Sequence, residues 1–259
     1  MKKENKWIEK LFAALLLLSA TAGVFRGYVL FEYTNHKNGL YTNNTAATVF
    51  LAVLLVILAV TAVLYFPLKK TEPDVSEKNG VFAKTVSGLC AVTLVVIAVV
   101  TVTSFRTAGF SVLRLIESVL CLVSAIFFVI NITGAKETLT KGIFAMFPAL
   151  YIAIHTIIIF IDTTTQINAS QRSFSLLFLV CLMMYFVTEA GFYIPAKDEK
   201  TAVESSKLSA QGKIWAVVSV EFAIAVAFPG VVFAIAIGDL TTIVYGIAHI
   251  CLAVYALTK

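Results

Sequence analysis

Three tyrosines in this chain each stand four residues before an ionisable side chain. The pairs are Tyr151–His155, Tyr185–Glu189 and Tyr245–His249. Residues at positions i and i+4 of a helix share one face, so each phenol points into the same region as its ionisable partner. Three interpretations of the two histidines stay open. They are neutral side chains hydrogen-bonded between helices, or a proton-relay or substrate site, or the ligands of a shared haem or metal.

The histidines also share an expected depth in the membrane. At a rise of 1.5 Å per residue, His155 lies about 18 Å from the inner end of its apolar run. His249 lies about 14 Å from the outer end of its own run. In a hydrocarbon core about 30 Å thick these are nearly the same level. We therefore predict that both imidazoles face the protein interior, with Tyr151 and Tyr245 on the same sides, and that a shared site would bring the rings close together.

Other charged residues lie inside apolar runs. A charge near the centre of a membrane span costs roughly 2.5–3.5 kcal/mol, so such residues are expected to face neighbouring helices. Arg114 and Glu117 are three residues apart on one helical face, and we expect them either to neutralise each other or to contact an ion or substrate. Glu189 and Glu221 lie within about two turns of the inner end of their runs, which predicts snorkelling or a cytoplasmic vestibule.

The composition is that of an integral membrane protein. Hydrophobic residues make up 59% of the 259 residues, charged residues only 14%, and the mean hydropathy is +0.92. A typical soluble domain is about 25% charged. The net charge of +5 is spread over short loops without a dense basic run, which excludes a nucleic-acid-binding face. The four cysteines lie within apolar runs and match neither a disulfide framework nor a zinc motif.

Apolar runs of about 20 residues predict an all-α, polytopic bundle of about eight transmembrane helices. The chain is expected to form a single integral membrane domain over residues 1–259. Leu11–Ala22 also resembles a signal peptide, but apolarity resumes at Val24, which favours an uncleaved first helix. The later spans are predicted at about 47–66, 84–105, 108–132, 143–161, 174–194, 214–237 and 240–257.

Basic residues distinguish the two sides of the predicted bundle. One side receives fifteen lysines, while the opposite loops receive only Lys37, Arg106 and Arg172. The positive-inside rule then predicts that both termini are cytoplasmic in a multi-pass protein of the cell membrane. The lysines on the basic side are Lys2, Lys3, Lys6, Lys10, Lys69, Lys70, Lys78, Lys84, Lys136, Lys141, Lys197, Lys200, Lys207, Lys213 and Lys259.

Two similar stretches suggest tandem halves. Tyr65–Lys69 and Tyr193–Lys197 share the pattern of a tyrosine, a proline two residues on and a lysine two residues after that, 128 residues apart. This shift maps the first four spans onto the last four and preserves their direction, so the halves, 1–133 and 134–259, would be parallel repeats. It also places Thr61 and Thr93 opposite Glu189 and Glu221. The helix break, or simple kink, expected at Pro229-Gly230 has no counterpart in the first half.

No catalytic or phosphate-binding motif occurs in the loops, so we expect no enzyme and no bound cofactor. The set of intramembrane ionisable residues favours a small secondary transporter or permease for an ion or small solute. A non-catalytic membrane subunit that binds or senses a partner protein is the alternative, and a haem-binding redox protein is a weaker one. The expected partners are the lipid bilayer, a small solute or ion and a membrane protein. Nucleic acid is not expected.

Overall fold

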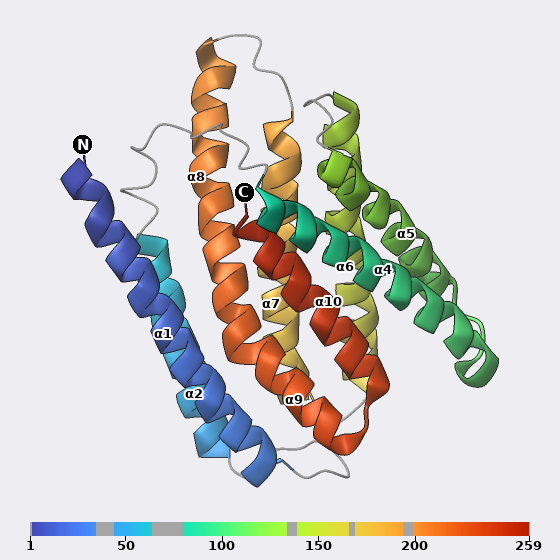
Figure 1. Ribbon diagram of the computed structural model, residues 1–259. Coiled ribbons are helices and arrows are strands. Elements are labelled where there is room, and N and C mark those ends of the chain that lie inside the picture. The colour runs from blue at the N-terminus through green and yellow to red at the C-terminus, as the bar shows by residue number, and fades with distance from the viewer. Residues whose placement is uncertain are drawn as a thin grey trace.

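The computed structural model describes residues 2–34, 44–63, 80–133, 139–165, 169–193 and 199–258. Within these ranges the regular elements are helices, which confirms the predicted all-α transmembrane bundle (Figure 1). Their bounds are α1 (Lys2–Glu32), α2 (Asn44–Val63), α4 (Val81–Ala108), α5 (Val112–Thr133), α6 (Leu139–Thr165), α7 (Ala169–Phe192), α8 (Glu199–Phe222), η1 (Ala223–Ala227), α9 (Phe228–Ile237) and α10 (Leu240–Ala256).

Seven of the described helical segments are long and apolar enough to cross a membrane. The predicted eighth span corresponds to α10, which is apolar but has only 17 residues. The turn before α10 explains its length. Gly238 ends α9 in the left-handed conformation (φ 76°), and Asp239 caps α10 by accepting a hydrogen bond from the Thr242 amide at 3.1 Å. The helix therefore cannot start earlier than Leu240.

The segment that we predicted as the seventh span is a continuous rod made of α8, η1 and α9. The rod begins at Glu199, so residues expected in an inner loop are helical. Pro229 does not break it, and the break predicted at Pro229-Gly230 is wrong. Proline removes one backbone donor and crowds the preceding turn. The chain accommodates it with five residues of π-helix, Ala223–Ala227, immediately before α9.

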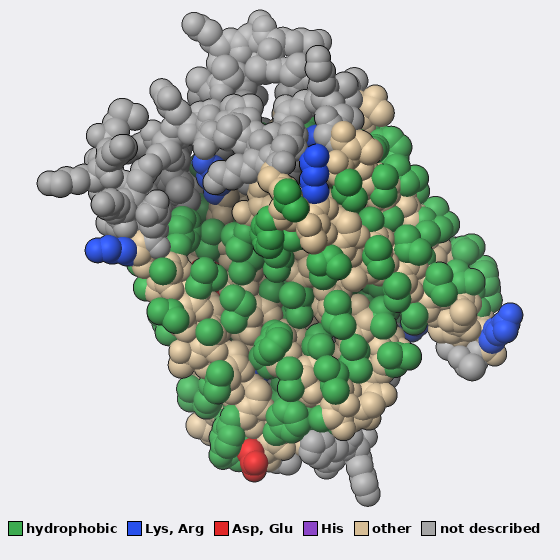
Figure 2. All heavy atoms as spheres, in the orientation of Figure 1, with side chains coloured by type: hydrophobic (Ala, Val, Ile, Leu, Met, Phe, Trp, Pro, Cys, Tyr) green, Lys and Arg blue, Asp and Glu red, His purple; other side chains and the backbone are tan. Residues whose placement is uncertain are grey.

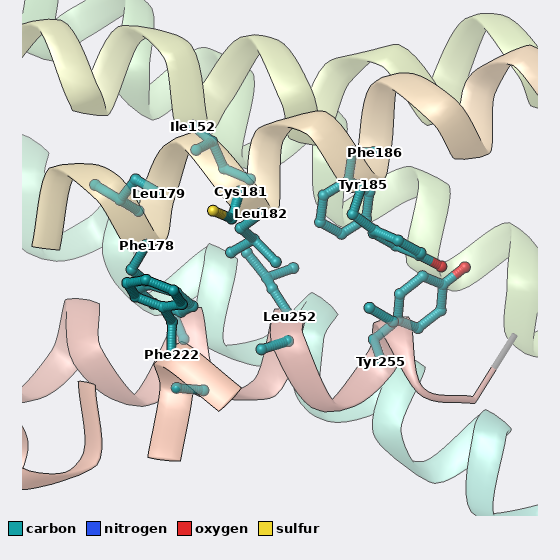
Figure 3. Packing of buried hydrophobic residues seen from close by; sticks show 14 of the residues in the cluster. Ile152, Phe178, Leu179, Cys181, Leu182, Tyr185, Phe186, Phe222, Leu252 and Tyr255 are labelled. Atoms are coloured by element: carbon teal, nitrogen blue, oxygen red, sulfur yellow. The ribbon is translucent and has the colours of Figure 1, made fainter. Parts of the chain in front are cut away.

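Six helical rods form the main bundle: α4, α5, α6, α7, α10 and the rod of α8, η1 and α9. Helices α1 and α2 lie to one side of it. Helix α4 packs on α5, α5 on α6, α6 on α7 and α7 on α8, while α10 contacts α4, α7, α8 and α9. Helices α1 and α2 pair with each other and lie against α8, and α1 also contacts η1 and α9 (Figure 1). The core between them is apolar and aromatic. Figure 3 shows Leu182 and Phe186 of α7 facing Leu252 and Tyr255 of α10, and Phe178 beside Phe222 of α8.

The outer surface suits a lipid environment. Figure 2 shows hydrophobic side chains over most of the visible face, with lysine and arginine at its edges. Large apolar residues are exposed along the helices, including Val92 and Val99 of α4 and Leu122 and Ile126 of α5. These exposed residues and the long apolar helices support a multi-pass, membrane-embedded chain.

Most of the repeated stretch lies outside the described residues, because Tyr65–Lys69 and 194–197 are not among them. The division into halves 1–133 and 134–259 therefore stays a prediction. Helix α1 runs uninterrupted past Ala22 and Gly27. That this first helix is retained stays a prediction.

Candidate functional site

Two histidines and two tyrosines from α6 and α10 meet inside the bundle. The rings of His155 and His249 have centroids 5.0 Å apart, and both side chains are buried. Tyr151 and Tyr245 lie in the same cluster. The prediction that both imidazoles face the interior and approach each other is therefore confirmed. We call these four residues, with Glu117 and Thr101, the histidine cluster.

A short hydrogen bond joins α5 to α6 in this cluster. The Nδ1 atom of His155 lies 2.6 Å from the Oε1 atom of Glu117, and the carboxylate is almost fully buried. The expected pairing of Glu117 with Arg114 is thus corrected: Glu117 contacts an imidazole on the next helix. Arg114 is only half-buried, since it lies closer to the helix end, whereas Glu117 points into the core. A bond this short is typical of a charge-assisted pair that shares one proton.

The phenol ring of Tyr245 stacks on the imidazole of His155. The centroids are 4.4 Å apart and the planes differ by only 9°. The Tyr245 hydroxyl lies 2.9 Å from the hydroxyl of Thr101 on α4, so the stack is fixed from a third helix. Aromatic faces favour a positive charge above them. The stack therefore suits His155 in its protonated form as well as its neutral form.

His249 has a different environment. Its Nε2 atom lies 3.0 Å from the Tyr151 hydroxyl, and Phe178 of α7 packs edge-on against the ring. The tautomer of the imidazole decides which of the two atoms donates, and both arrangements suit a neutral His249 ring. Two positive imidazoles 5.0 Å apart would repel each other. The two histidines thus have different partners: the Glu117 carboxylate for His155 and the Tyr151 phenol for His249.

A close helix contact holds α10 in place. A Cβ atom at Gly246 would overlap the side chain of Val231 on α9, so only glycine allows this approach. Gly246 lies between Tyr245 and His249 on the chain. The small residue therefore sets how closely α10 approaches α9 next to the two polar rings.

A second polar group lies further along α10. The Tyr255 hydroxyl donates to the Oε1 atom of Glu189 at 2.8 Å and accepts from the Asn131 amide at 3.0 Å. Figure 3 shows the Tyr185 hydroxyl pointing toward that of Tyr255. Tyr185 and Glu189 thus share one region, as predicted, but they lie apart from the histidine cluster. In Figure 3, Leu182 and Leu252 lie between the Tyr185–Tyr255 pair and Phe178, whose ring packs on His249.

Glu189 and Glu221 do not snorkel. Both side chains are buried, and each is bound by a hydroxyl from another helix. The Thr61 hydroxyl of α2 lies 2.9 Å from one oxygen of Glu221 and 3.1 Å from the other. The expected vestibule position is therefore wrong for this conformation. Each carboxyl lies against a neighbouring helix that supplies a hydroxyl: α10 for Glu189 and α2 for Glu221.

Several buried polar residues were not predicted as part of a site. Asn131, Thr101 and Tyr255 bind members of the two polar groups. Arg26 of α1 is also buried, and its guanidinium lies 5.0 Å from the Phe50 ring and 4.7 Å from the Phe174 ring. The interruption of the first apolar run at Arg26 was visible in the sequence, but its aromatic partners come from α2 and α7.

The cluster does not fit a haem. A haem between the two histidines would need a nitrogen of each ring to face one iron through the porphyrin. Instead the ring centroids lie only 5.0 Å apart, which leaves no room for a porphyrin between them, and Tyr245 covers a face of His155. In the part of the chain that the structure describes, no group of three His, Cys, Asp or Glu side chains is arranged to hold a metal ion.

Comparison with known proteins adds no assignment. No protein-family model matches the chain, and searches of curated proteins and of solved structures return no match. The function must therefore be inferred from the geometry of the chain's own residues.

Proposed function

We propose that this protein is a small secondary transporter, rather than an enzyme, and that it couples the movement of an ion or small solute to a proton held by Glu117 and His155. The observation that carries this proposal is the buried 2.6 Å bond between the two side chains. Ionisable residues inside membrane bundles commonly mark proton relays or transport paths. Both termini are proposed to lie on the cytoplasmic side of the cell membrane, from the distribution of lysines.

The pair supports this role because its charge depends on its proton count. With one shared proton, Glu117 and His155 together are neutral, which suits a closed and water-free core. Removal of that proton leaves a net negative charge, and addition of a second leaves a net positive charge. Either change makes burial costly and favours a conformation in which water or a solute reaches the pair. Protonation therefore biases the bundle between closed and open forms.

The surrounding residues support the same mechanism. Tyr245 covers one face of His155, and Thr101 orients the phenol. His249 lies beside the pair as a neutral ring and offers a second site to which a proton can pass. These residues come from α4, α5, α6 and α10. A change in the charge of the Glu117–His155 pair therefore alters contacts among four helices.

Flux into proteoliposomes tests the proposal. A pH-sensitive dye trapped inside vesicles would report proton movement when sodium, potassium, chloride or labelled amino acids are added in turn. We expect one of these probes to move protons with the wild-type protein and Glu117→Gln or His155→Gln to abolish that movement. The exposed carboxylate of Glu32 gives a matched control, since Glu32→Gln should keep the wild-type rate.

A flat response would contradict transport of these probes. If the wild-type protein gives no more flux than empty vesicles and instead co-purifies with a stoichiometric membrane protein, the subunit or sensor role replaces the transporter.

A further inference from the structure

Glu221 lies where the side pair of helices, α1 and α2, meets the core. It is on the last turn of α8, directly before the π-helix η1, and is 1% exposed. Its two carboxyl oxygens lie 3.1 and 2.9 Å from the Thr61 hydroxyl near the end of α2. Helices α1 and α2 both pack on α8 at this level (Figure 1). The carboxyl is therefore sealed between the two parts of the bundle.

The number of hydrogens at Thr61 constrains the state of Glu221. The Thr61 oxygen lies 2.9 Å from the Ile57 carbonyl as well as near both Glu221 oxygens, but a hydroxyl carries one hydrogen. If Glu221 were ionised, three acceptors would compete for that hydrogen. If Glu221 is protonated, its own O–H donates to Thr61, and Thr61 donates to Ile57. The protonated form thus supplies two hydrogens to these three close oxygen pairs, whereas the ionised form supplies only one.

The charges around Glu221 favour the same state. Thr61 is its sole hydrogen-bond or ion-pair partner among the described residues. An ionised carboxylate buried without a cation is strongly unfavourable, and one hydroxyl does not compensate for it. Proton binding removes the charge altogether.

Among the described residues of the neighbouring elements, no ionisable group pairs with this carboxyl. Helix α2 has none within Asn44–Val63, and η1 has none. On α7, the Cys181 thiol lies within electrostatic range. On α1, the Arg26 guanidinium lies between two phenylalanine rings. On α10, Tyr245, His249 and Tyr255 are bonded to Thr101, Tyr151 and Glu189, and Cys251 is half-buried.

We propose that Glu221 is a proton-binding site separate from the histidine cluster, and that its proton holds α1 and α2 against α8. A second close contact one turn later supports the mechanical part. A Cβ atom at Gly23 of α1 would lie 2.6 Å from the Ile224 carbonyl in η1, so the backbones touch there. Loss of the proton leaves a negative charge on Glu221, buried where α1 and α2 pack against α8. Water can reach the charge only if α1 and α2 separate from α8.

Infrared spectroscopy of the protein in lipid nanodiscs tests the proton directly. The difference between wild type and Glu221→Gln should contain a carbonyl band of a protonated carboxylic acid at neutral pH, and that band should disappear at alkaline pH. Thr61→Val should shift the band without removing it, because the carboxyl loses its acceptor. A difference spectrum with no protonated-acid band across the whole pH range overturns the proposal.

Hydrogen exchange tests the mechanical part and separates it from a merely structural role. Between neutral and alkaline pH, the opening of α2 relative to a core helix should increase about tenfold in wild type, which corresponds to about 1.4 kcal/mol. Glu221→Gln, which cannot ionise, should show no pH-dependent increase. Equal pH dependence in both proteins would overturn the proposal that the Glu221 proton holds α1 and α2 against α8. Neither measurement depends on solute flux, so the site and the proposed transport can fail independently.

Discussion

The imidazole of His155 and the phenol of Tyr245 lie face to face, 4.4 Å apart, although 90 residues separate them in the chain. This stack joins α6 to α10, and the bond from His155 to Glu117 extends the contact to α5. A single imidazole therefore connects three helices. Any change in its charge or orientation acts on all three.

The Glu117–His155 pair should behave as one energetic unit. Because each partner alone would be left buried and unpaired, we expect Glu117→Leu and His155→Leu each to destabilise the protein by about 3–5 kcal/mol. The double variant Glu117→Leu with His155→Leu should cost less than the sum of its single changes. Unfolding in mixed detergent micelles would measure the cycle, and additive effects would contradict a direct pair.

The Tyr245 hydroxyl and ring should make separable contributions. Tyr245→Phe keeps the stack on His155 but loses the bond to Thr101, which should cost about 0.5–1.5 kcal/mol. Tyr245→Leu also loses the aromatic contact, a further loss of about 0.5–1.5 kcal/mol. Thr101→Val should resemble Tyr245→Phe in thermal unfolding. A Phe variant as unstable as the Leu variant would show that the hydroxyl, rather than the stack, dominates.

Gly246 and Gly230 provide a matched pair for the packing of α10. Gly246→Ala places a methyl group into Val231 and should cost about 1–3 kcal/mol, whereas a Cβ atom at Gly230 meets no neighbour. Gly230→Ala should be neutral or slightly stabilising. Adding Val231→Ala to Gly246→Ala should restore part of the stability. Comparable losses for both glycine variants would argue against the close approach of α10 to α9.

Cysteine labelling should establish the proposed orientation. In a background with the four native cysteines replaced by serine or alanine, Asn38→Cys and Gln166→Cys should react with an impermeant maleimide from outside intact cells. Ser76→Cys and Ser206→Cys should react only after the membrane is opened. The reversed pattern would place both termini outside.

The spacing of tyrosine and histidine predicted the core of the site because helical periodicity alone puts positions i and i+4 on one face. Depth along the apolar runs then predicted that His155 and His249 would meet. The partner of Glu117 could not be obtained in this way. Arg114 is close in sequence, but α5 turns Glu117 toward α6, and only the packing of the two helices brings His155 to it.

The missed residues share one physical cause. Asn131, Thr101 and Thr61 are single polar residues in apolar runs, and such residues can bond to their own helix backbone or sit at an interface. Thr61 does bond to the Ile57 carbonyl, but it also reaches Glu221 across 160 residues of sequence. Likewise, Pro229 predicted a break. A π-helix preserves the rod, and no local pattern distinguished the two outcomes.

The shortness of α10 has a consequence for the lipid around it. Seventeen residues span only about 26 Å, less than the roughly 30 Å of a typical hydrocarbon core. The bilayer beside the Gly238–Asp239 turn must thin, or headgroups must descend to meet Asp239, at a cost of a fraction of a kcal/mol per Å of mismatch. A thicker membrane would thus pull on the one helix that carries Tyr245, His249 and Tyr255. The acyl-chain length of the lipid would therefore change the position of these buried polar residues without any direct contact between them and the lipid.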